Sequence, residues 1–185
     1  MALVPDRVIR GLLFDRDDTL VVDVPYNADP RLVVPVPGAR RAVDRARSAG
    51  LRVGVVTNQS VIAKGLATRE QVDATNARVD QLVGPFDVWC VCPHDDADDC
   101  ACRKPRPGMV LDAADRLGLS PETLVVIGDV GADVQAARAA GAQGVLVPTG
   151  RTLRHEVDDA DTVAASLDAA VQLVIDHAGP ATDRT

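Results

Sequence analysis

Residues 8–19 are VIRGLLFDRDDT, a run of apolar side chains that ends in two carboxylates two residues apart. The apolar part, Val8–Phe14, predicts a buried strand. Asp15 and Asp17 follow where that strand ends, and an ionised carboxylate is costly to bury there unless a partner offsets its charge. Mg²⁺ prefers carboxylate oxygens, and open parallel sheets bind ligands at the carboxyl ends of their strands, so the stretch predicts a magnesium site. Taken alone, it also fits a polar loop with helix N-cap residues.

The composition is that of a globular chain with few aromatic residues. Of 185 residues, 46% are hydrophobic and 2% aromatic, so we expect one domain with a core mainly of Val, Leu and Ala. The net charge of −7 argues against nucleic-acid and anionic-membrane partners, both of which need a basic surface. No apolar segment has the length of a membrane span, and residues 1–7 lack the layout of a signal peptide. We therefore expect a cytoplasmic protein, in which four Cys favour metal binding over disulfides.

Short apolar runs alternate with amphipathic stretches along the chain. We expect strands at residues 8–14, 51–56, 88–91, 124–127 and 144–147, and helices at about 38–48, 69–83, 107–118, 133–140 and 162–177. Thr68 and Gln71 form a capping-box pattern before the second helix. The alternation implies an α/β fold, a parallel sheet with right-handed crossovers. We expect a single domain over residues 1–185, with irregular surface loops near the site at 21–37 and 93–107 and a flexible tail at about 179–185.

Polar side chains gather after nearly every predicted strand. They are Asp15, Asp17 and Thr19 after the first strand, Thr57 and Asn58 after the second, Asp129 and Asp133 after the fourth, and Lys104 after a Cys-rich loop. In a parallel sheet these strand ends converge at one edge. One carboxylate there can be the nucleophile of phosphoryl transfer, and a second can protonate the leaving oxygen. Hydroxyl, amide and ammonium groups can bind phosphoryl oxygens, while further carboxylates hold Mg²⁺.

Each of these residues also has a simpler interpretation when it is considered by itself. Thr57 and Asn58 could cap a turn, and Lys104 could be a solvated charge. Asp133 could be a helix N-cap, a role that is compatible with serving a metal. The conjunction of all the motifs favours a phosphoryl-transfer site.

In order and spacing the motifs resemble motifs one to four of the haloacid-dehalogenase-like (HAD-like) phosphatases. The matching residues are Asp15-x-Asp17-x-Thr19, Thr57-Asn58, Lys104 and Gly128-Asp129-x-x-x-Asp133, within about residues 8–150. The resemblance implies a three-layer Rossmann-like fold. It implies that Asp15 is the nucleophile and that Asp17 is the general acid and base, with its backbone carbonyl as a metal ligand. It also implies that Thr57, Asn58 and Lys104 bind the phosphoryl group, that Asp15 and Asp129 ligate Mg²⁺, and that Asp133 acts through water or as an orienting group.

A second cluster combines soft metal ligands in one short loop. Cys92-Pro93-His94 is followed by Cys100-Ala101-Cys102. Three thiolates and an imidazole satisfy the tetrahedral coordination of structural Zn²⁺, and such clustering in a cytosolic chain favours a metal over incidental residues. The spacing differs from that of a zinc finger, because the ligands close a single loop at 92–102. Cys90 lies on the preceding strand and is predicted to be a core residue, whereas the aspartates at 95–99 form a solvated face.

The zinc loop narrows the resemblance to a small branch of the family without a large cap domain. In that branch a zinc loop leads into Cys-Arg-Lys-Pro, as residues 102–105 do here. The branch contains D-glycero-D-manno-heptose 1,7-bisphosphate 7-phosphatase and the histidinol-phosphate phosphatase domain. The resemblance implies that zinc fixes the loop that places Arg103 and Lys104. It also implies that Arg103 contacts the substrate, since a guanidinium binds phosphate bidentately.

The leading functional hypothesis is a Mg²⁺-dependent phosphomonoesterase with an aspartyl-phosphate intermediate. Residues 57–60 and 103–109 resemble the heptose enzyme more than the histidinol enzyme, so heptose 1,7-bisphosphate is the favoured substrate. The alternatives are histidinol phosphate, another small phosphorylated metabolite, or a zinc-stabilised binding module without activity. Since the chain has no heptad pattern and no obvious apolar patch, we expect a monomer.

Three residues depart from the pattern of the family. Asp18 stands where Gly is usual, although Asp tolerates a left-handed backbone. Val61 replaces a Gly expected after residues 57–60, and Val130 follows Asp129 where a polar or basic residue is common. These departures leave the predicted chemistry intact and the substrate open.

Overall fold

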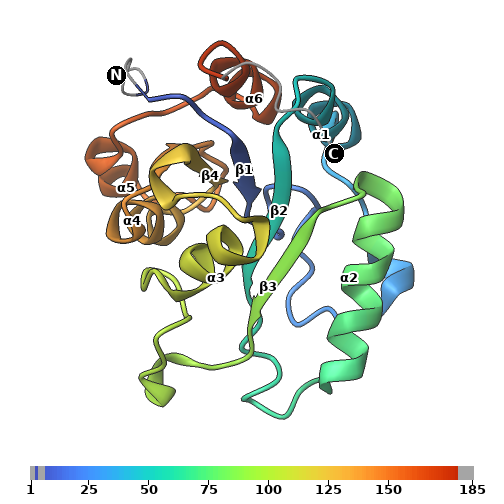
Figure 1. The fold of residues 1–185 in the computed structure, drawn as a ribbon. Coiled ribbons are helices and arrows are strands. Elements are labelled where there is room, and N and C mark those ends of the chain that lie inside the picture. The colour runs from blue at the N-terminus through green and yellow to red at the C-terminus, as the bar shows by residue number, and fades with distance from the viewer. Residues whose placement is uncertain (1–2, 4–6, 179–185) are drawn as a thin grey trace.

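The protein folds around a five-stranded parallel sheet (Figure 1). The computed structural model describes residue 3 and residues 7–178. The strands are β1 (Gly11–Phe14), β2 (Arg52–Asn58), β3 (Val88–Cys92), β4 (Leu124–Gly128) and β5 (Gln143–Leu146). Their order is β3-β2-β1-β4-β5, and each neighbouring pair is parallel. β1 is therefore the central strand, with the carboxyl ends of β2 and β4 on either side of it.

Helices cover both faces of the sheet, which confirms the predicted α/β fold. They are α1 (Ala39–Ser48), α2 (Arg69–Val83), α3 (Gly108–Leu117), α4 (Gly131–Ala140), α5 (Arg154–Asp159) and α6 (Leu167–Ile175). Leu12 and Phe14 share a core with α1, α2 and α6, whereas Leu13 shares a core with α3 and α4. Successive side chains of a strand point to opposite faces, so both faces of β1 are buried and its sequence is continuously apolar.

Local signals set several element boundaries as predicted. The Thr68 hydroxyl accepts a hydrogen bond from the Gln71 backbone N–H (3.2 Å), and the Gln71 side chain accepts one from the Thr68 N–H (2.8 Å). The capping box at the start of α2 is thereby confirmed. Gly141 follows α4 with a φ of 83°, a left-handed conformation that costs glycine little.

Two predicted boundaries are wrong by three residues or more, others differ by one or two residues, and one α-helix was not predicted. β1 begins at Gly11 and not at Val8, because Ile9 forms only an isolated bridge, with Ala178. The last helix begins at Leu167 and not near residue 162, because residues 162–164 hydrogen-bond alongside Leu146 of β5. The unpredicted helix is α5, which follows the turn after β5.

The segments after β1 and β3 are mostly irregular, as predicted. Residues 21–37 contain one short 3-10 turn at Pro30–Leu32, and residues 93–107 contain one at Asp96–Asp98. Within the described residues, no large cap domain covers the sheet. No helix in this part of the chain is long and apolar enough to cross a membrane. The tail predicted to be flexible, 179–185, lies outside the described residues.

Candidate active site

The predicted catalytic groups meet where the central strands end. Asp15 directly follows β1, Thr57 and Asn58 end β2, and Asp129 directly follows β4. The Asp15 backbone N–H donates to the carbonyl oxygen of Ile127 (2.9 Å), which holds the end of β1 against β4. A cavity of about 200 Å³ opens at this edge of the sheet, and it is lined by Asp15, Asp17, Asp18, Asp23, Asn58, Lys104, Asp129, Val130, Ala132, Asp133 and Arg151. We call this space the reaction cavity.

Lys104 lies at the centre of a buried ion triad. Its ammonium donates to Asp15 Oδ1 (2.6 Å), Asp133 Oδ1 (2.6 Å) and the carbonyl oxygen of Val56 (2.9 Å). These three contacts use all three donors of an ammonium group. Burial by itself lowers the pKa of Lys104, but the two carboxylates raise it overall. The side chain is therefore a fixed cation beside Asp15.

The carboxylates around the triad have the composition of a divalent-cation site. Asp15, Asp129 and Asp133 are buried, and each offers an oxygen within 4.8 Å of the others. Burial raises the pKa of Asp15 to about 8, although Lys104 opposes the shift, and burial raises the pKa of Asp129 to about 7. A divalent cation among these oxygens would favour their charged forms. An all-oxygen donor set of this kind fits Mg²⁺.

Asp133 is held in place by the start of α4. It is the third residue of that helix, and its carboxylate accepts a hydrogen bond from the Val130 backbone N–H (3.2 Å). A Cβ atom at Gly128 would overlap the Asp133 carboxylate, so the strand end must be glycine for this side chain to reach Lys104. Asp133 is therefore not the N-cap that the sequence suggested, because Val130 holds that position. From the third helical position its carboxylate accepts a bond from the N-cap N–H and also contacts Lys104.

Asn58 and Lys104 are joined by a reciprocal pair of hydrogen bonds. Asn58 Oδ1 accepts from the Lys104 backbone N–H (3.1 Å), and Asn58 Nδ2 donates to the Lys104 carbonyl oxygen (3.2 Å). The Asn58 side chain therefore fixes the backbone that carries the catalytic-site ammonium. The neighbouring Thr57 hydroxyl is buried and accepts a hydrogen bond from Gln59 Nε2 (2.9 Å).

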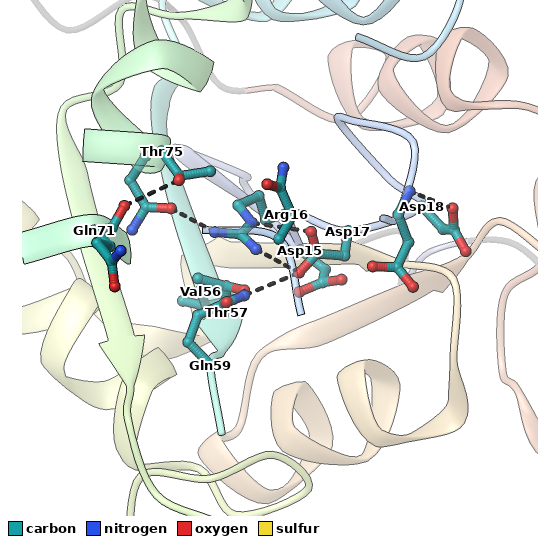
Figure 2. A network of polar contacts seen from close by, with 12 residues as sticks. Asp15, Arg16, Asp17, Asp18, Val56, Thr57, Gln59, Gln71 and Thr75 are labelled. Atoms are coloured by element: carbon teal, nitrogen blue, oxygen red, sulfur yellow. Dashed lines mark hydrogen bonds and ion pairs between the residues drawn. The ribbon is translucent and has the colours of Figure 1, made fainter. Parts of the chain in front are cut away.

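Asp17 is held by a network that the sequence analysis did not identify (Figure 2). The Arg16 guanidinium donates to both Asp17 oxygens, at 3.0 Å each, and also to Asn76 Oδ1 of α2 (2.7 Å). Gln59 Nε2 donates to Asp17 Oδ2 (2.9 Å). Arg16, Gln59 and Asn76 are each less than a tenth exposed, whereas the Asp17 side chain that they support is 30% exposed. The position of Arg16 between two motif carboxylates could have indicated this network in the sequence. Its other partner, Asn76, is 60 residues away and gives no local pattern.

Asp18 adopts the left-handed conformation that the sequence analysis allowed, with a φ of 55°. Its carboxylate accepts a hydrogen bond from the Asp23 backbone N–H (2.9 Å) and lies 3.4 Å from Arg151 Nε. Arg151 also forms an ion pair with Asp23, and the sequence analysis did not single out either residue. Thr19 is buried, and within the described residues its hydroxyl has no hydrogen-bond partner.

The Cys and His residues of the loop at 92–102 converge on one point. Cys92 Sγ lies 3.0 Å from Cys102 Sγ and 3.7 Å from Cys100 Sγ, and His94 Nδ1 lies 3.3 Å from Cys102 Sγ. Tetrahedral Zn²⁺ with Zn–S bonds of about 2.3 Å places its sulfur ligands about 3.8 Å apart. The donor set therefore fits a structural zinc ion, and Cys92 and Cys100 have close to this separation, whereas Cys92 and Cys102 lie nearer to each other. Cys90 is outside this cluster and is buried, which confirms its prediction as a core residue.

Arg103 and the aspartates of the same loop pair with one another. Arg103 Nε donates to Asp96 Oδ1 (2.6 Å), and its Nη1 donates to the His94 carbonyl oxygen (3.3 Å). Arg106 pairs with Asp99. The predicted solvated face therefore also carries two ion pairs, and the Arg103 side chain is engaged within its own loop. Of the other family departures, Val61 is a buried residue of a small apolar cluster, and Val130 lines the reaction cavity.

Comparison with known proteins places this site in a defined group. Residues 101–170 match a family model described as HAD-hydrolase-like. The chain is 36% identical to a D-glycero-β-D-manno-heptose-1,7-bisphosphate 7-phosphatase of Pseudomonas aeruginosa, over 77% of this chain and 83% of that protein. It is 35% identical to the phosphatase of the same name from Pseudomonas putida, over 89% of this chain and 98% of that protein. A solved structure of D,D-heptose 1,7-bisphosphate phosphatase from B. bronchiseptica, complexed with magnesium and phosphate, is similar with a TM-score of 0.80 and 30% identity, covering 92% of this chain and 100% of that chain.

Proposed function

Because the chain belongs to the HAD-like phosphatase family, we propose that this phosphatase removes the 7-phosphate from D-glycero-β-D-manno-heptose 1,7-bisphosphate. The observation that carries the proposal is the 35% identity over 98% of the length of a phosphatase named for that reaction. The assembled strand-end site supports it, since nucleophile, acid, cation and metal ligands are all present within one cavity.

In the proposed reaction Asp15 attacks the phosphorus atom. Lys104 contacts Asp15 through Oδ1, so the other carboxylate oxygen can face the substrate. The bond from that oxygen to phosphorus forms as the bond from phosphorus to the sugar oxygen breaks, which gives an aspartyl phosphate. The Lys104 ammonium, fixed by Asp133, stabilises the charge on the phosphoryl oxygens, and Asn58 lines the cavity that would hold them. Thr57 is not among the described residues that line this cavity, and its buried hydroxyl accepts a hydrogen bond from Gln59.

Asp17 is proposed to act as the general acid and then as the general base. It gives a proton to the leaving sugar oxygen, and it later takes one from the water that hydrolyses the aspartyl phosphate. Arg16 and Gln59 position its carboxylate for both steps. Mg²⁺ would be held by Asp15, Asp129 and the backbone carbonyl of Asp17, with Asp133 orienting the set, and it would screen the repulsion between carboxylate and phosphate.

A substrate panel tests the proposed function. Purified protein with Mg²⁺ is assayed for phosphate release from heptose 1,7-bisphosphate, histidinol phosphate and other small phosphate esters. We expect the highest kcat/KM for the heptose bisphosphate, with the 7-phosphate removed, as ³¹P NMR of the product would show. A higher kcat/KM for histidinol phosphate than for the heptose bisphosphate would overturn the heptose assignment and favour a histidinol-phosphate phosphatase.

We also propose that Cys92, His94, Cys100 and Cys102 hold a structural Zn²⁺ that fixes the loop bearing Arg103 and Lys104. Elemental analysis is expected to find about one zinc ion per chain. Cys100→Ser should lower the zinc content and reduce Tm by at least about 5 °C, because the metal's binding energy contributes to folding. The matched control is Cys90→Ala, which removes a buried thiol outside the cluster and should keep the zinc. Equal zinc content in Cys100→Ser and wild-type protein would contradict the assignment.

The positioning role of Arg16 makes a separate prediction. Arg16→Met removes the bidentate contact to Asp17, so kcat/KM for a sugar phosphate, which reports formation of the aspartyl phosphate, should fall by about 10- to 100-fold. The loss should be much smaller for p-nitrophenyl phosphate, because its leaving group departs without protonation. The control Arg69→Met breaks an exposed ion pair with Asp73 on α2 and should change neither rate. Equal losses on both substrates would show that Arg16 does not act through the acid.

A further inference from the structure

Two cavities meet at the exposed side chain of Arg151. One is the reaction cavity, and the other is a neighbouring cavity of about 300 Å³. The second cavity is lined by Arg16, Asp17, Asp23, Val24, Pro25, Tyr26, Asn27, Asn58, Gln59, Ser60, Val61 and Arg151. The two spaces share Asp17, Asp23, Asn58 and Arg151. The second cavity is rich in amide, hydroxyl and carboxylate groups, which suits the hydroxyls of a sugar, so we call it the sugar cavity.

Among the cations that line these cavities in the described part of the chain, Arg151 is the exposed one that the reacting phosphoryl group at Asp15 does not use. Lys104 is buried beside Asp15, and Arg16 is committed to Asp17 and Asn76. The Arg151 side chain is 57% exposed. Arg103 does not line either cavity in the described part of the chain and is paired with Asp96.

The turn that carries Arg151 is tied to the reaction centre. The Thr152 hydroxyl donates to the Asp129 carbonyl oxygen (2.6 Å) and accepts from the Thr149 backbone N–H (2.8 Å). The Thr149 hydroxyl in turn lies 3.4 Å from Asp129 Oδ2. Because both flanking threonines contact Asp129, the Arg151 backbone has a fixed position relative to the carboxylate cluster.

Two carboxylates hold the Arg151 guanidinium at the junction of the cavities. Asp23 pairs with Nη1, and Asp18 Oδ2 lies 3.4 Å from Nε. Asp23 is positioned by its own backbone N–H, which donates to Asp18 Oδ1. Asp18 is the residue that replaces a usual glycine in this family, so this part of the arrangement is a property of this chain. A guanidinium in such a setting can exchange carboxylate partners for a phosphate, because it binds both bidentately.

We propose that Arg151 binds the second, non-reacting phosphate of a sugar bisphosphate whose carbon chain occupies the sugar cavity, and that Asp18 competes with this phosphate for the guanidinium. The inference rests on the proposed function, in which one phosphate reacts at Asp15 and the other remains on the product. It assigns a specificity-determining contact to a residue outside the four motifs. It also gives Asp18 a function, because this carboxylate tunes the affinity for the second phosphate.

The test compares a bisphosphate with its matching monophosphate. kcat/KM is measured for heptose 1,7-bisphosphate and for heptose 7-phosphate in wild-type protein, Arg151→Met and Arg151→Lys. We expect Arg151→Met to lower the ratio of kcat/KM for the bisphosphate to kcat/KM for the monophosphate by about 10- to 100-fold. The change should come mainly from a higher KM for the bisphosphate, because the variant loses a charged contact with its second phosphate. Arg151→Lys should recover part of the ratio. A ratio unchanged within about threefold in Arg151→Met would overturn the proposal.

A control variant at Arg154 and a second variant at Asp18 distinguish the contact between Arg151 and the phosphate from a general effect of charge. Arg154→Met removes a cation three residues away on α5 whose side chain is 96% exposed, and it should leave the ratio unchanged. Asp18→Asn keeps a side chain that tolerates a positive φ and an acceptor for the Asp23 N–H, but it removes the competing charge. It should lower KM for the bisphosphate by about threefold without lowering KM for the monophosphate. An unchanged or raised KM for the bisphosphate would overturn the competition.

Failure of the proposed function would be recognised separately. Wild-type protein would then hydrolyse p-nitrophenyl phosphate but not the heptose bisphosphate. In that case the contact between Arg151 and the second phosphate is tested by binding. The rise in Tm of the inactive variant Asp15→Asn is measured with fructose 1,6-bisphosphate and with fructose 6-phosphate. A larger stabilisation by the bisphosphate that disappears in Asp15→Asn/Arg151→Met supports the Arg151 contact, and equal stabilisation by the two ligands overturns it.

Discussion

Asp15→Asn is expected to abolish phosphatase activity, with kcat on the heptose bisphosphate reduced about 10⁴-fold or more. An amide has the shape of the carboxylate but cannot attack phosphorus to give a stable acyl phosphate, so no other group of the site replaces it. The residue follows the central strand directly, and the hydrogen bond from its backbone to Ile127 does not depend on the side chain. The measurement is phosphate release under saturating Mg²⁺.

The same variant should remain folded, which separates loss of chemistry from loss of structure. Lys104 keeps Asp133 and the Val56 carbonyl as partners when Asp15 is neutral. Burial raises the pKa of Asp15 to about 8, so the charged carboxylate is a costly group to bury and its removal costs the fold little. Far-UV circular dichroism should therefore match wild type. Asp44→Asn, an exposed site paired with Arg40 on α1, is the activity control, and equal activity in Asp15→Asn and Asp44→Asn would contradict the assigned nucleophile.

Lys104→Met is expected to have the largest effect on stability, with a free energy of unfolding reduced by about 3–5 kcal/mol. The substitution keeps an apolar stem of similar length but leaves the Asp15 and Asp133 carboxylates buried without their shared cation. Urea denaturation in zinc-containing buffer without magnesium measures the effect, since added Mg²⁺ would bind the freed carboxylates. Activity should also be lost, because the phosphoryl oxygens would lack the ammonium.

A double variant identifies the origin of that instability. Lys104→Met/Asp133→Asn removes one of the two buried carboxyl groups that lose their cation, so it should recover a substantial part of the lost unfolding free energy while remaining inactive. If the single variant were as stable as wild type, or if the double variant were less stable than the single one, the buried triad would not account for the role of Lys104. The two readouts therefore test the structural and the chemical function of one side chain.

Much of the fold follows from local pattern. The capping box at Thr68 and the glycine after α4 each act through neighbouring residues, and the structure has them as predicted. The apolar run before Asp15 forms the predicted strand, although the strand begins at Gly11. The predicted start of α6 was wrong because the sequence at 162–166 is also compatible with an extended segment beside the edge strand of the sheet. In the structure this segment pairs with Leu146 of β5. Short-range signals could not decide between these two outcomes.

The candidate metal-binding and phosphate-binding residues could be predicted from the sequence because each lies at a fixed place in its own motif. Asp15 and Asp129 are brought together by the strand order, since β4 lies beside β1. Lys104 lies on the loop after β3, and Asn58 at the end of β2 holds its backbone near them. Their partners outside the motifs could not be found in this way. Asn76 of α2 reaches Arg16 only after that helix packs on the sheet, and Arg151 reaches Asp18 only after the turn that follows β5 is tied to Asp129.

The sequence by itself determined the parallel α/β architecture, the strand-end carboxylates and the four candidate zinc ligands. The physical reason is that side-chain periodicity, glycines at the ends of helices and motif spacing depend on residues close together in the chain. They can therefore be recognised before the packing is known. Only the tertiary structure decided that Lys104 is shared between Asp15 and Asp133, that Arg16 orients Asp17, and that Arg103 turns toward Asp96 while Arg151 lies between the two cavities. The contacts of Lys104 and Arg151 join segments far apart in the chain, whereas Arg16 and Arg103 pair with residues near them in sequence. In each case the partner is chosen by distance and burial after the helices have packed on the sheet.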